Sequence, residues 1–291
     1  MPRDARKNVG ASVRAKLLDR ARKEKTDYQV LLTRYALERL LYRLGISEHR
    51  DRFVLKGAML FITWLNDPFR PTRDLDLLGF GANDSDSIAE TFKAICQTEA
   101  PDDGVIFSVD TLTAAPIRED VEYGGVRVQT HATIDGARIP IQVDIGFGDA
   151  ITPAPLEITY PVLLDSPAPR LRAYPAATVV AGKFNAIVVL GIANSRLKDY
   201  YDLWFISNTF TFELTELRNS VKRTFERRDT PIPKDVPVGL SAVYGEEWSA
   251  RWKAFLKREQ MNTAPEELHI VLEDLRRFLM PLIAKSGGDA R

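Results

Sequence analysis

The sequence predicts an α+β protein with a mixed core of strands and helices and a helical C-terminal half. Apolar residues recur at helical spacing before residue 50 and after residue 175, whereas alternating runs typical of strands are confined to the region between them. We therefore expect a helical cap over residues 1–50, a mixed core over residues 51–170 and a helical domain over residues 171–291.

The predicted elements follow the chain in this order. Helices over 13–23 and 28–44 precede a strand at 53–55, a helix at 58–65, a strand from Asp74, a helix at 88–97 and strands at 105–109, 126–134 and 138–147. Asp135-Gly136 predicts a tight hairpin between the last two strands. Proline and polar residues at 152–175 indicate a linker or domain crossing, and helices follow at 178–191, 196–207, 213–228 and 266–285.

Composition limits the functions that the chain can serve. Forty basic and forty acidic residues in 291 cancel, which excludes a polycation that coats nucleic acid along its whole surface. A nucleic-acid contact therefore needs a local patch, and a solvated helix face is the alternative interpretation of such a patch. The candidate basic residues are Arg218, Lys222, Arg223, Arg227 and Arg228.

Cysteine, histidine and apolar segments exclude further classes of site. One cysteine, Cys96, and three scattered histidines give no support to a disulfide, a zinc site or a catalytic triad. The N-terminal segment lacks the apolar core of a secretory signal, so we expect a cytoplasmic location and no membrane contact. The most apolar stretch, residues 176–193, contains Lys183 near its middle and is expected to be a buried helix.

Asp74 and Asp76 are the first candidates for chemistry. They lie two positions apart in a predicted strand, so both project from one face while Leu75 and Leu77 project from the other. Two neighbouring carboxylates require a proton, a basic group or a metal ion between them, and Mg²⁺ prefers oxygen ligands. A solvated strand end explains most isolated Asp-x-Asp patterns, so the surrounding motifs decide whether Asp74 and Asp76 form a metal site.

A third carboxylate, Asp144, is expected on the polar face of the last strand. The alternatives are a strand-end role or an ion pair with Arg138, and Asp149 is a less favoured substitute. Paired acids, a glycine turn and a later acid are typical of metal-dependent nucleotidyl transfer, which needs positioning and charge neutralisation. A glycosyltransferase also uses Asp-x-Asp, but after a nucleotide-binding α/β half, which does not precede Asp74 here.

Five ordered motifs resemble the AbiEii/AbiGii nucleotidyltransferase toxin family, the MenT-like toxins of type IV toxin–antitoxin systems. They are RFVLKGAMLF, RPTRDLDLLGFG, IPIQVDIGFGD, AGKFNAIVVLG and RLKDYYDLW. The resemblance covers nearly the whole chain. It implies a DNA polymerase β-type nucleotidyltransferase core, Mg²⁺ as the cofactor, an NTP substrate, an RNA acceptor such as the 3′ end of tRNA, and a cognate antitoxin.

The resemblance also implies roles for single residues. The metal ligands would be Asp74 and Asp76, with Asp144 as the third acid. The nucleotide would contact Lys183 and the glycine-containing turn that follows the first strand. A further acid would come from a helix of the C-terminal half. The turn residues are Lys56, Gly57, Ala58 and Met59, Arg73 flanks the acids and could bind phosphate or neutralise them, and the later acid is Asp199 or Asp202.

Several alternatives stay open at this level. Lys183 could extend from a buried helix to the surface, one of the two later acids could lie on a solvated face, and Tyr200 or Tyr201 could stack a base or pack in the core. The family's turn typically reads Lys-Gly-Gly-Ser or Lys-Gly-Gly-Thr, whereas this chain has Ala58-Met59. That departure leaves backbone N–H groups and Lys56 for phosphate contact, and it is the reason for one alternative, nucleotide binding without turnover. A second alternative keeps the fold but transfers to a small molecule or a protein.

Overall fold

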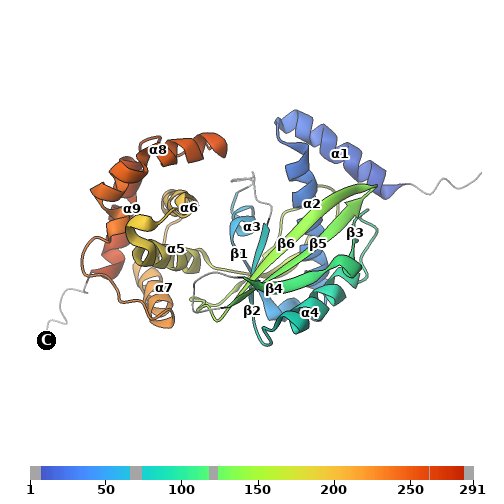
Figure 1. The fold of residues 1–291 in the computed structure, drawn as a ribbon, viewed down its shortest axis with the longest axis horizontal. Helices are drawn as coiled ribbons and strands as arrows, with labels where there is room; N and C mark the ends of the chain where they lie inside the picture. The colour runs from blue at the N-terminus through green and yellow to red at the C-terminus, as the bar shows by residue number, and fades with distance from the viewer. Residues whose placement is uncertain (1–7, 66–73, 118–123, 262, 285–291) are drawn as a thin grey trace, which may run out of the picture. The chain divides into compact units, whose positions relative to one another are not determined.

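The computed structural model describes residues 8–65, 74–117, 124–261 and 263–284, and the chain divides into two compact units. Unit 1 comprises Met1–Gly148 and Leu156–Ala173, and unit 2 comprises Asp149–Pro155 and Tyr174–Arg291 (Figure 1). The chain therefore leaves unit 1 after Gly148, returns to it at Leu156 and leaves it again after Ala173.

Unit 1 is built on a mixed sheet, with eight strands among the described residues. The strands are β1 (Phe53–Lys56), β2 (Asp74–Gly79), β3 (Ile106–Phe107), β4 (Thr113–Ile117), β5 (Gly125–Ile134), β6 (Ala137–Phe147), β7 (Leu156–Thr159) and β8 (Arg170–Ala173). Their order is β3-β5-β6-β2-β1-β8-β7, and β4 also pairs with β5. β2 is parallel to β6 and β1 is parallel to β8, while the other pairs are antiparallel. The sheet confirms the predicted fold class.

Helices cover the apolar face of this sheet. The helices of unit 1 are α1 (Val9–Glu24), α2 (Tyr28–Ile46), α3 (Ala58–Phe61) and α4 (Ser85–Gln97). α2 packs on β6 and β8, and α4 packs on β4 and β5 (Figure 1). Leu75, Leu77, Val143 and Ile145 are each almost fully buried, so their side chains form the covered face. The residues that alternate with them therefore project from the opposite face.

Local sequence explains where several elements begin. The Asp27 carboxylate accepts a hydrogen bond from the Gln29 N–H at the start of α2, and the Asp84 carboxylate accepts one from the Ser87 N–H at the start of α4. The predicted hairpin is confirmed, because Asp135 and Gly136 have φ values of 43° and 80° and join β5 to β6.

Unit 2 is helical, as predicted. Its helices are α5 (Ala176–Leu190), α6 (Leu197–Thr209), α7 (Leu214–Arg227), α8 (Ala242–Arg258) and α9 (Leu268–Ile283). The segment Ala176–Ala193 is long and apolar enough to cross a membrane by length and composition, and half of it is buried. Within unit 2 α5 packs against α6 and α7, and Phe184 and Ile187 are fully buried, which confirms the expected buried helix.

Several elements differ from the sequence expectation. The stretch 152–175, expected to be a linker or a domain crossing, does pass between the two units, but it also contains β7 and β8. Each of these strands has four residues, which is too short to show a clear alternation. The strand expected over 105–109 shortens to Ile106–Phe107, because a 3₁₀ turn, η2, begins at Val109. β4 and α8 were not expected from the sequence, although Tyr244, Trp248 and Trp252 of α8 follow helical spacing and are buried.

Candidate active site

A row of four charged residues crosses the polar face of the sheet in unit 1. The register pairs Lys56 of β1 with Asp76 of β2, Asp76 with Asp144 of β6, and Asp144 with Arg127 of β5. Residues paired directly across neighbouring strands project from the same face. The row therefore reads basic, acidic, acidic, basic, and we call these four residues the charged row.

Asp74 extends the acidic centre of the charged row by one position along β2. It lies two residues before Asp76 and is paired with Gln142 of β6, so both β2 acids share the face of the row. Both acids are half-buried, whereas Leu75 between them is buried. The structure thus places Asp74, Asp76 and Asp144 on one face, as the sequence predicted.

Arg127 holds Asp144 with both arms of its guanidinium. Nε donates to Oδ1 and Nη2 donates to Oδ2 of Asp144, each over 2.8 Å. The alternative pairing of Asp144 with Arg138 is wrong, because Arg138 instead lies 3.2 Å from Nδ1 of His131. Arg127 was not identified from the sequence, although counting back from the Asp135-Gly136 turn places it opposite Asp144.

Gly57 makes room for Asp76. Its φ of 71° and ψ of −158° lie in a region that is open almost only to glycine. A Cβ at position 57 would lie 1.9 Å from Oδ2 of Asp76, so the carboxylate packs directly over the glycine backbone. Gly146 makes similar room for Lys56, because a Cβ there would lie 2.7 Å from its Nζ. Both glycines belong to the site, and Gly146 was not identified from the sequence.

The acids share one face of the sheet and offer the oxygen ligands that a divalent cation prefers. Asp74 and Asp76 offer carboxylate oxygens on one face, and Asp144 offers a third carboxylate on the adjacent strand. In the structure both oxygens of Asp144 accept hydrogen bonds from Arg127. Among the described residues, no three Asp, Glu, His or Cys side chains are already grouped to hold a metal ion.

The side chains of the predicted phosphate turn are part of the core. Ala58 and Met59 are 6% and 0% exposed, and the Tyr160 hydroxyl donates to Sδ of Met59 over 3.6 Å. The side chains of these two residues are therefore not accessible to a ligand. Arg73, the further residue predicted to contact the nucleotide, lies outside the described residues.

A second charged cluster forms inside unit 2. Nζ of Lys183 lies 2.6 Å from Oδ1 of Asp199 and 2.8 Å from Oδ2 of Asp202, and Nε of Arg196 lies 2.7 Å from the other oxygen of Asp199. Both acids are fully buried, and the Lys183 side chain is 15% exposed. The alternatives of a lysine reaching the surface and of a solvated acidic face are therefore wrong.

Attraction within this cluster outweighs the cost of burial. Burial alone would lower the pKa of Lys183, but the charges of Asp199 and Asp202 raise it above the usual value. Burial alone would likewise raise the pKa of Asp199, but Lys183 and Arg196 lower it. Lys183 and Asp199 are therefore both charged at neutral pH. Arg196 was not identified from the sequence, although it precedes Asp199 by three residues at the start of α6.

The two tyrosines of α6 pack in the core, so the base-stacking alternative is wrong for both. Tyr200 is fully buried, its hydroxyl donates to the Gly239 carbonyl over 2.9 Å, and its ring stacks on Tyr244. The Tyr201 hydroxyl shares a hydrogen bond of 2.8 Å with Oγ1 of Thr263, and this side chain is 2% exposed.

The predicted basic patch divides into two kinds of residue. Arg228 donates to Oδ1 of Asp149 and to Oδ1 of Asn185, so it stabilises unit 2 internally. Arg218 similarly donates to the Pro281 carbonyl. Lys222, Arg223 and Arg227 are exposed on α7, and the first two lie near Glu226.

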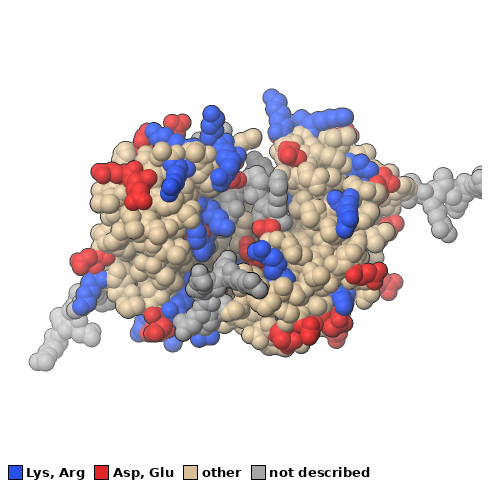
Figure 2. Space-filling view, in the orientation of Figure 1, with Lys and Arg blue, Asp and Glu red and all other residues tan. Residues whose placement is uncertain are grey.

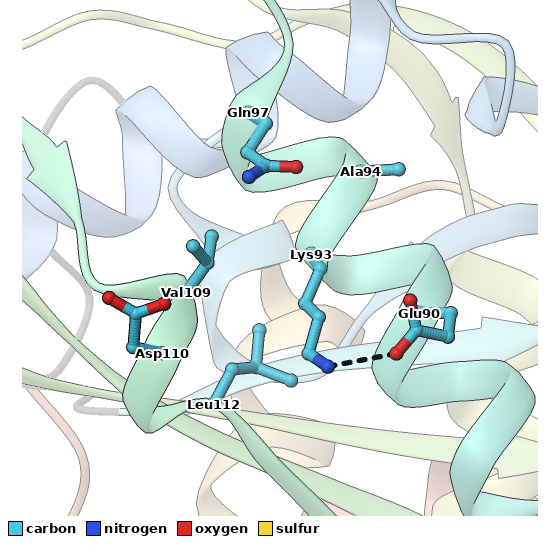
Figure 3. Close-up of a pocket in the computed structure, with 7 residues that line it drawn as sticks. All are labelled: Glu90, Lys93, Ala94, Gln97, Val109, Asp110 and Leu112. Atoms are coloured by element: carbon cyan, nitrogen blue, oxygen red, sulfur yellow. Dashed lines mark hydrogen bonds and ion pairs between the residues drawn. The ribbon is translucent and has the colours of Figure 1, made fainter.

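Neither the surface charge visible in one view (Figure 2) nor the cavity beside α4 marks an additional site. Acidic and basic side chains are interspersed on the visible face of each unit (Figure 2). A cavity of about 610 Å³ lies between α4 and η2, with the ion pair of Lys93 and Glu90 at its wall (Figure 3). None of the predicted site residues lines this cavity, and the strands that carry the charged row do not contribute to it.

Comparison with known proteins agrees with this fold. A family model described as nucleotidyl transferase AbiEii toxin, type IV TA system, matches residues 39–279. The crystal structure of JHP933 from Helicobacter pylori has a TM-score of 0.51 and 14% sequence identity over 87% of this chain and 94% of its own. A "putative nucleotidyltransferase" from H. pylori gives the same score and identity over 88% and 98%. At this identity the two structures show likeness of fold alone. No curated protein matches the chain.

Proposed function

Because the chain belongs to the AbiEii family of nucleotidyl transferase toxins of type IV toxin–antitoxin systems, we propose that it transfers a nucleoside monophosphate from an NTP to RNA, at the 3′ end of tRNA. The acceptor hydroxyl oxygen bonds to the α-phosphorus, the bond from that phosphorus to the bridging oxygen breaks, and pyrophosphate leaves. The hydroxyl proton passes to a carboxylate of the site. A cognate antitoxin would restrain this activity in cells.

The acidic centre of the charged row carries the proposal. Asp74 and Asp76 would hold Mg²⁺, and Asp144 would serve as the third ligand or accept the proton. A bound divalent cation would neutralise the charge of the triphosphate. The carboxylate of Asp76 lies over Gly57, next to the turn whose backbone would meet the phosphates.

Lys183 is the second part of the proposal. Its family motif assigns it to the nucleotide phosphates, and the acids Asp199 and Asp202 fix its ammonium on two sides. A lysine held in this way loses little conformational entropy when it meets an anion. The acids would therefore act as positioning residues for Lys183.

The exposed residues of α7 would contact the RNA backbone. Lys222 and Arg223 are 65% and 70% exposed, so neither is needed to hold unit 2 together. We expect the K222Q/R223Q double variant to bind tRNA more weakly, with a salt dependence of log K that is less steep by about 1 for each residue. Unchanged binding and slope would remove this helix from the RNA surface.

A transfer assay tests the central proposal. Purified protein is incubated with Mg²⁺, total tRNA and each of the four labelled NTPs in turn, beside the D76N variant. We expect label in tRNA with the wild type and none with D76N. Label in protein or in a small molecule would overturn the RNA acceptor. Absence of any label, together with equal harmlessness of the wild type and D76N in cells, would overturn transfer itself.

Nucleotide binding without turnover is the second candidate function. It is favoured by two observations: Ala58-Met59 replaces the glycine and hydroxyl of the usual turn, and Arg127 occupies both oxygens of Asp144. Calorimetric NTP binding that D76N abolishes, combined with no transfer to tRNA, protein or small molecules, would decide for it.

A further inference from the structure

The pairing of Arg127 with Asp144 is unusual for a contact at a surface. It is bidentate, with both bonds at 2.8 Å, yet the Arg127 side chain is 40% exposed and Asp144 is 20% exposed. The two-armed geometry strengthens this ion pair, whereas its partial exposure to solvent weakens it. The contact also occupies both oxygens of Asp144.

The neighbours of this pair supply a reason for the contact. Asp144 lies directly beside Asp76 on the adjacent strand, and like charges placed opposite each other destabilise a sheet. Arg127 lies on the far side of Asp144, and Lys56 lies on the far side of Asp76. The charged row thus contains one basic residue for each of its two central acids, and Asp74 adds a third carboxylate to the same face.

A divalent cation and Arg127 would need the same oxygen atoms. A guanidinium that bonds both oxygens of a carboxylate leaves that carboxylate poorly placed to bind a metal ion, so coordination by Asp144 requires at least one Arg127 bond to break. The cation would also approach the positive charge of Arg127 across Asp144, which costs further free energy.

We propose that Arg127 is an internal counter-ion that competes with the divalent cation for Asp144 and thereby sets the cation affinity of the site. The inference rests on the proposed function, because it takes the three acids as the cation site. Arg127 is a positioning residue. When no cation is bound, its two hydrogen bonds hold Asp144 in the charged row, and at least one of these bonds breaks when a cation binds. The released guanidinium matches a phosphate as well as a carboxylate, so cation entry and triphosphate binding would favour each other.

A measurement of manganese binding tests the competition between Arg127 and the cation, and it does not require catalytic activity. Mn²⁺ is titrated into nucleotide-free protein, and the free ion is followed by electron paramagnetic resonance. We expect R127Q to bind Mn²⁺ about three- to tenfold more tightly than the wild type, a range set by a partly exposed ion pair. R127K, which keeps the charge but not the two-armed contact, should be intermediate. R138Q removes a positive charge from the same hairpin without touching Asp144 and should bind like the wild type.

The possible outcomes separate the competing explanations. Affinity in R127Q that is unchanged or weaker than in the wild type would overturn the inference, because Arg127 would then only orient Asp144 or stabilise the sheet. Tighter binding that R138Q reproduces would also overturn it, as a general effect of charge. If neither the wild type nor R127Q binds Mn²⁺, or if the D76N substitution does not remove the binding, the cation site of the proposed function is overturned as well. Melting curves show whether each variant is folded. If R127Q unfolds, the Mn²⁺ affinity of R127K is compared with that of the wild type instead.

Discussion

Substituting Lys183 with methionine removes the ammonium that joins two buried carboxylates, and we expect unit 2 to lose about 3 kcal/mol of stability at neutral pH, the lower end of the range for breaking a buried ion pair. The magnitude follows from the geometry. Nζ lies 2.6 and 2.8 Å from Asp199 and Asp202, both fully buried. Methionine keeps most of the volume, so the cost is mainly that of uncompensated negative charge. Arg196 stays 2.7 Å from Asp199, which limits the loss.

The cost should shrink in acid, and the sign follows from the pKa shifts. In the wild type the pKa of Asp199 is lowered, so its contribution is present above about 3.8 and is lost as pH falls through the lower folded value. The pKa of Lys183 is raised, so its contribution is present below about 10.5 and is lost as pH rises through the higher folded value. Without Lys183 one of the charges that lower the pKa of Asp199 is gone, so this pKa rises and protonation in acid relieves part of the variant's penalty.

Urea unfolding at about pH 5 and pH 7.5 measures both effects. Trp204, Trp248 and Trp252 lie in unit 2, so tryptophan fluorescence reports mainly on this unit. The control is K198M, which removes an exposed lysine one position before Asp199 and should change stability by less than about 0.5 kcal/mol. A K183M penalty below about 1 kcal/mol at neutral pH, or one equal at both pH values, would refute the reasoning.

A balanced double variant separates stability from function. K183M/D202N removes one positive and one negative charge and leaves the pair of Arg196 with Asp199, so it should recover much of the stability that K183M loses. If Lys183 contacts the nucleotide, the double variant stays deficient in transfer despite its regained stability. Recovery of transfer together with stability would show that Lys183 has a structural role alone.

Three further predictions concern single sites. Glu38 is fully buried, and burial raises its pKa to about 6. Its contribution to stability is therefore fully present below about pH 4.5 and is lost as pH rises through about 6. The E38Q variant should remove roughly 2 kcal/mol of this pH dependence, measured by urea unfolding. G57A would place a Cβ against Asp76 at a φ of 71°, and we expect at least about tenfold slower transfer with a lower melting temperature. R228M removes the ion pair with Asp149 and should lower the free energy of unfolding by about 1 kcal/mol in urea, without weakening tRNA binding.

Short-range patterns predicted a large part of the unit 1 site. The two-residue spacing of Asp74 and Asp76 fixed their common face, and alternation in the last strand placed Asp144 on the same face. The dipeptide Asp135-Gly136 predicted the hairpin that carries Asp144. These features depend on neighbours in the chain, and local periodicity therefore reveals them.

Contacts between distant segments were not accessible in the same way. Nothing in the sequence near Gly146 shows that the ammonium of Lys56 reaches it, since 90 positions separate the two residues in the chain. The burial of Asp199 and Asp202 was also missed, because acids three apart on a helix are ordinarily solvated. Their burial follows from the pairing with Lys183 on α5, which is a tertiary contact.

The register of one hairpin connects these observations. Since β5 and β6 meet at a two-residue turn, the pairing is set from Ile134 with Ala137, and seven steps further it places Arg127 against Asp144. A shift of one residue would move every side chain of β5 to the other face, so the charge that faces Asp144 is fixed by a turn far from the acids. The sequence that forms the turn thus also sets the counter-ion of the candidate site. If Arg127 governs cation affinity as proposed, the turn determines a property of the chemistry as well as of the fold.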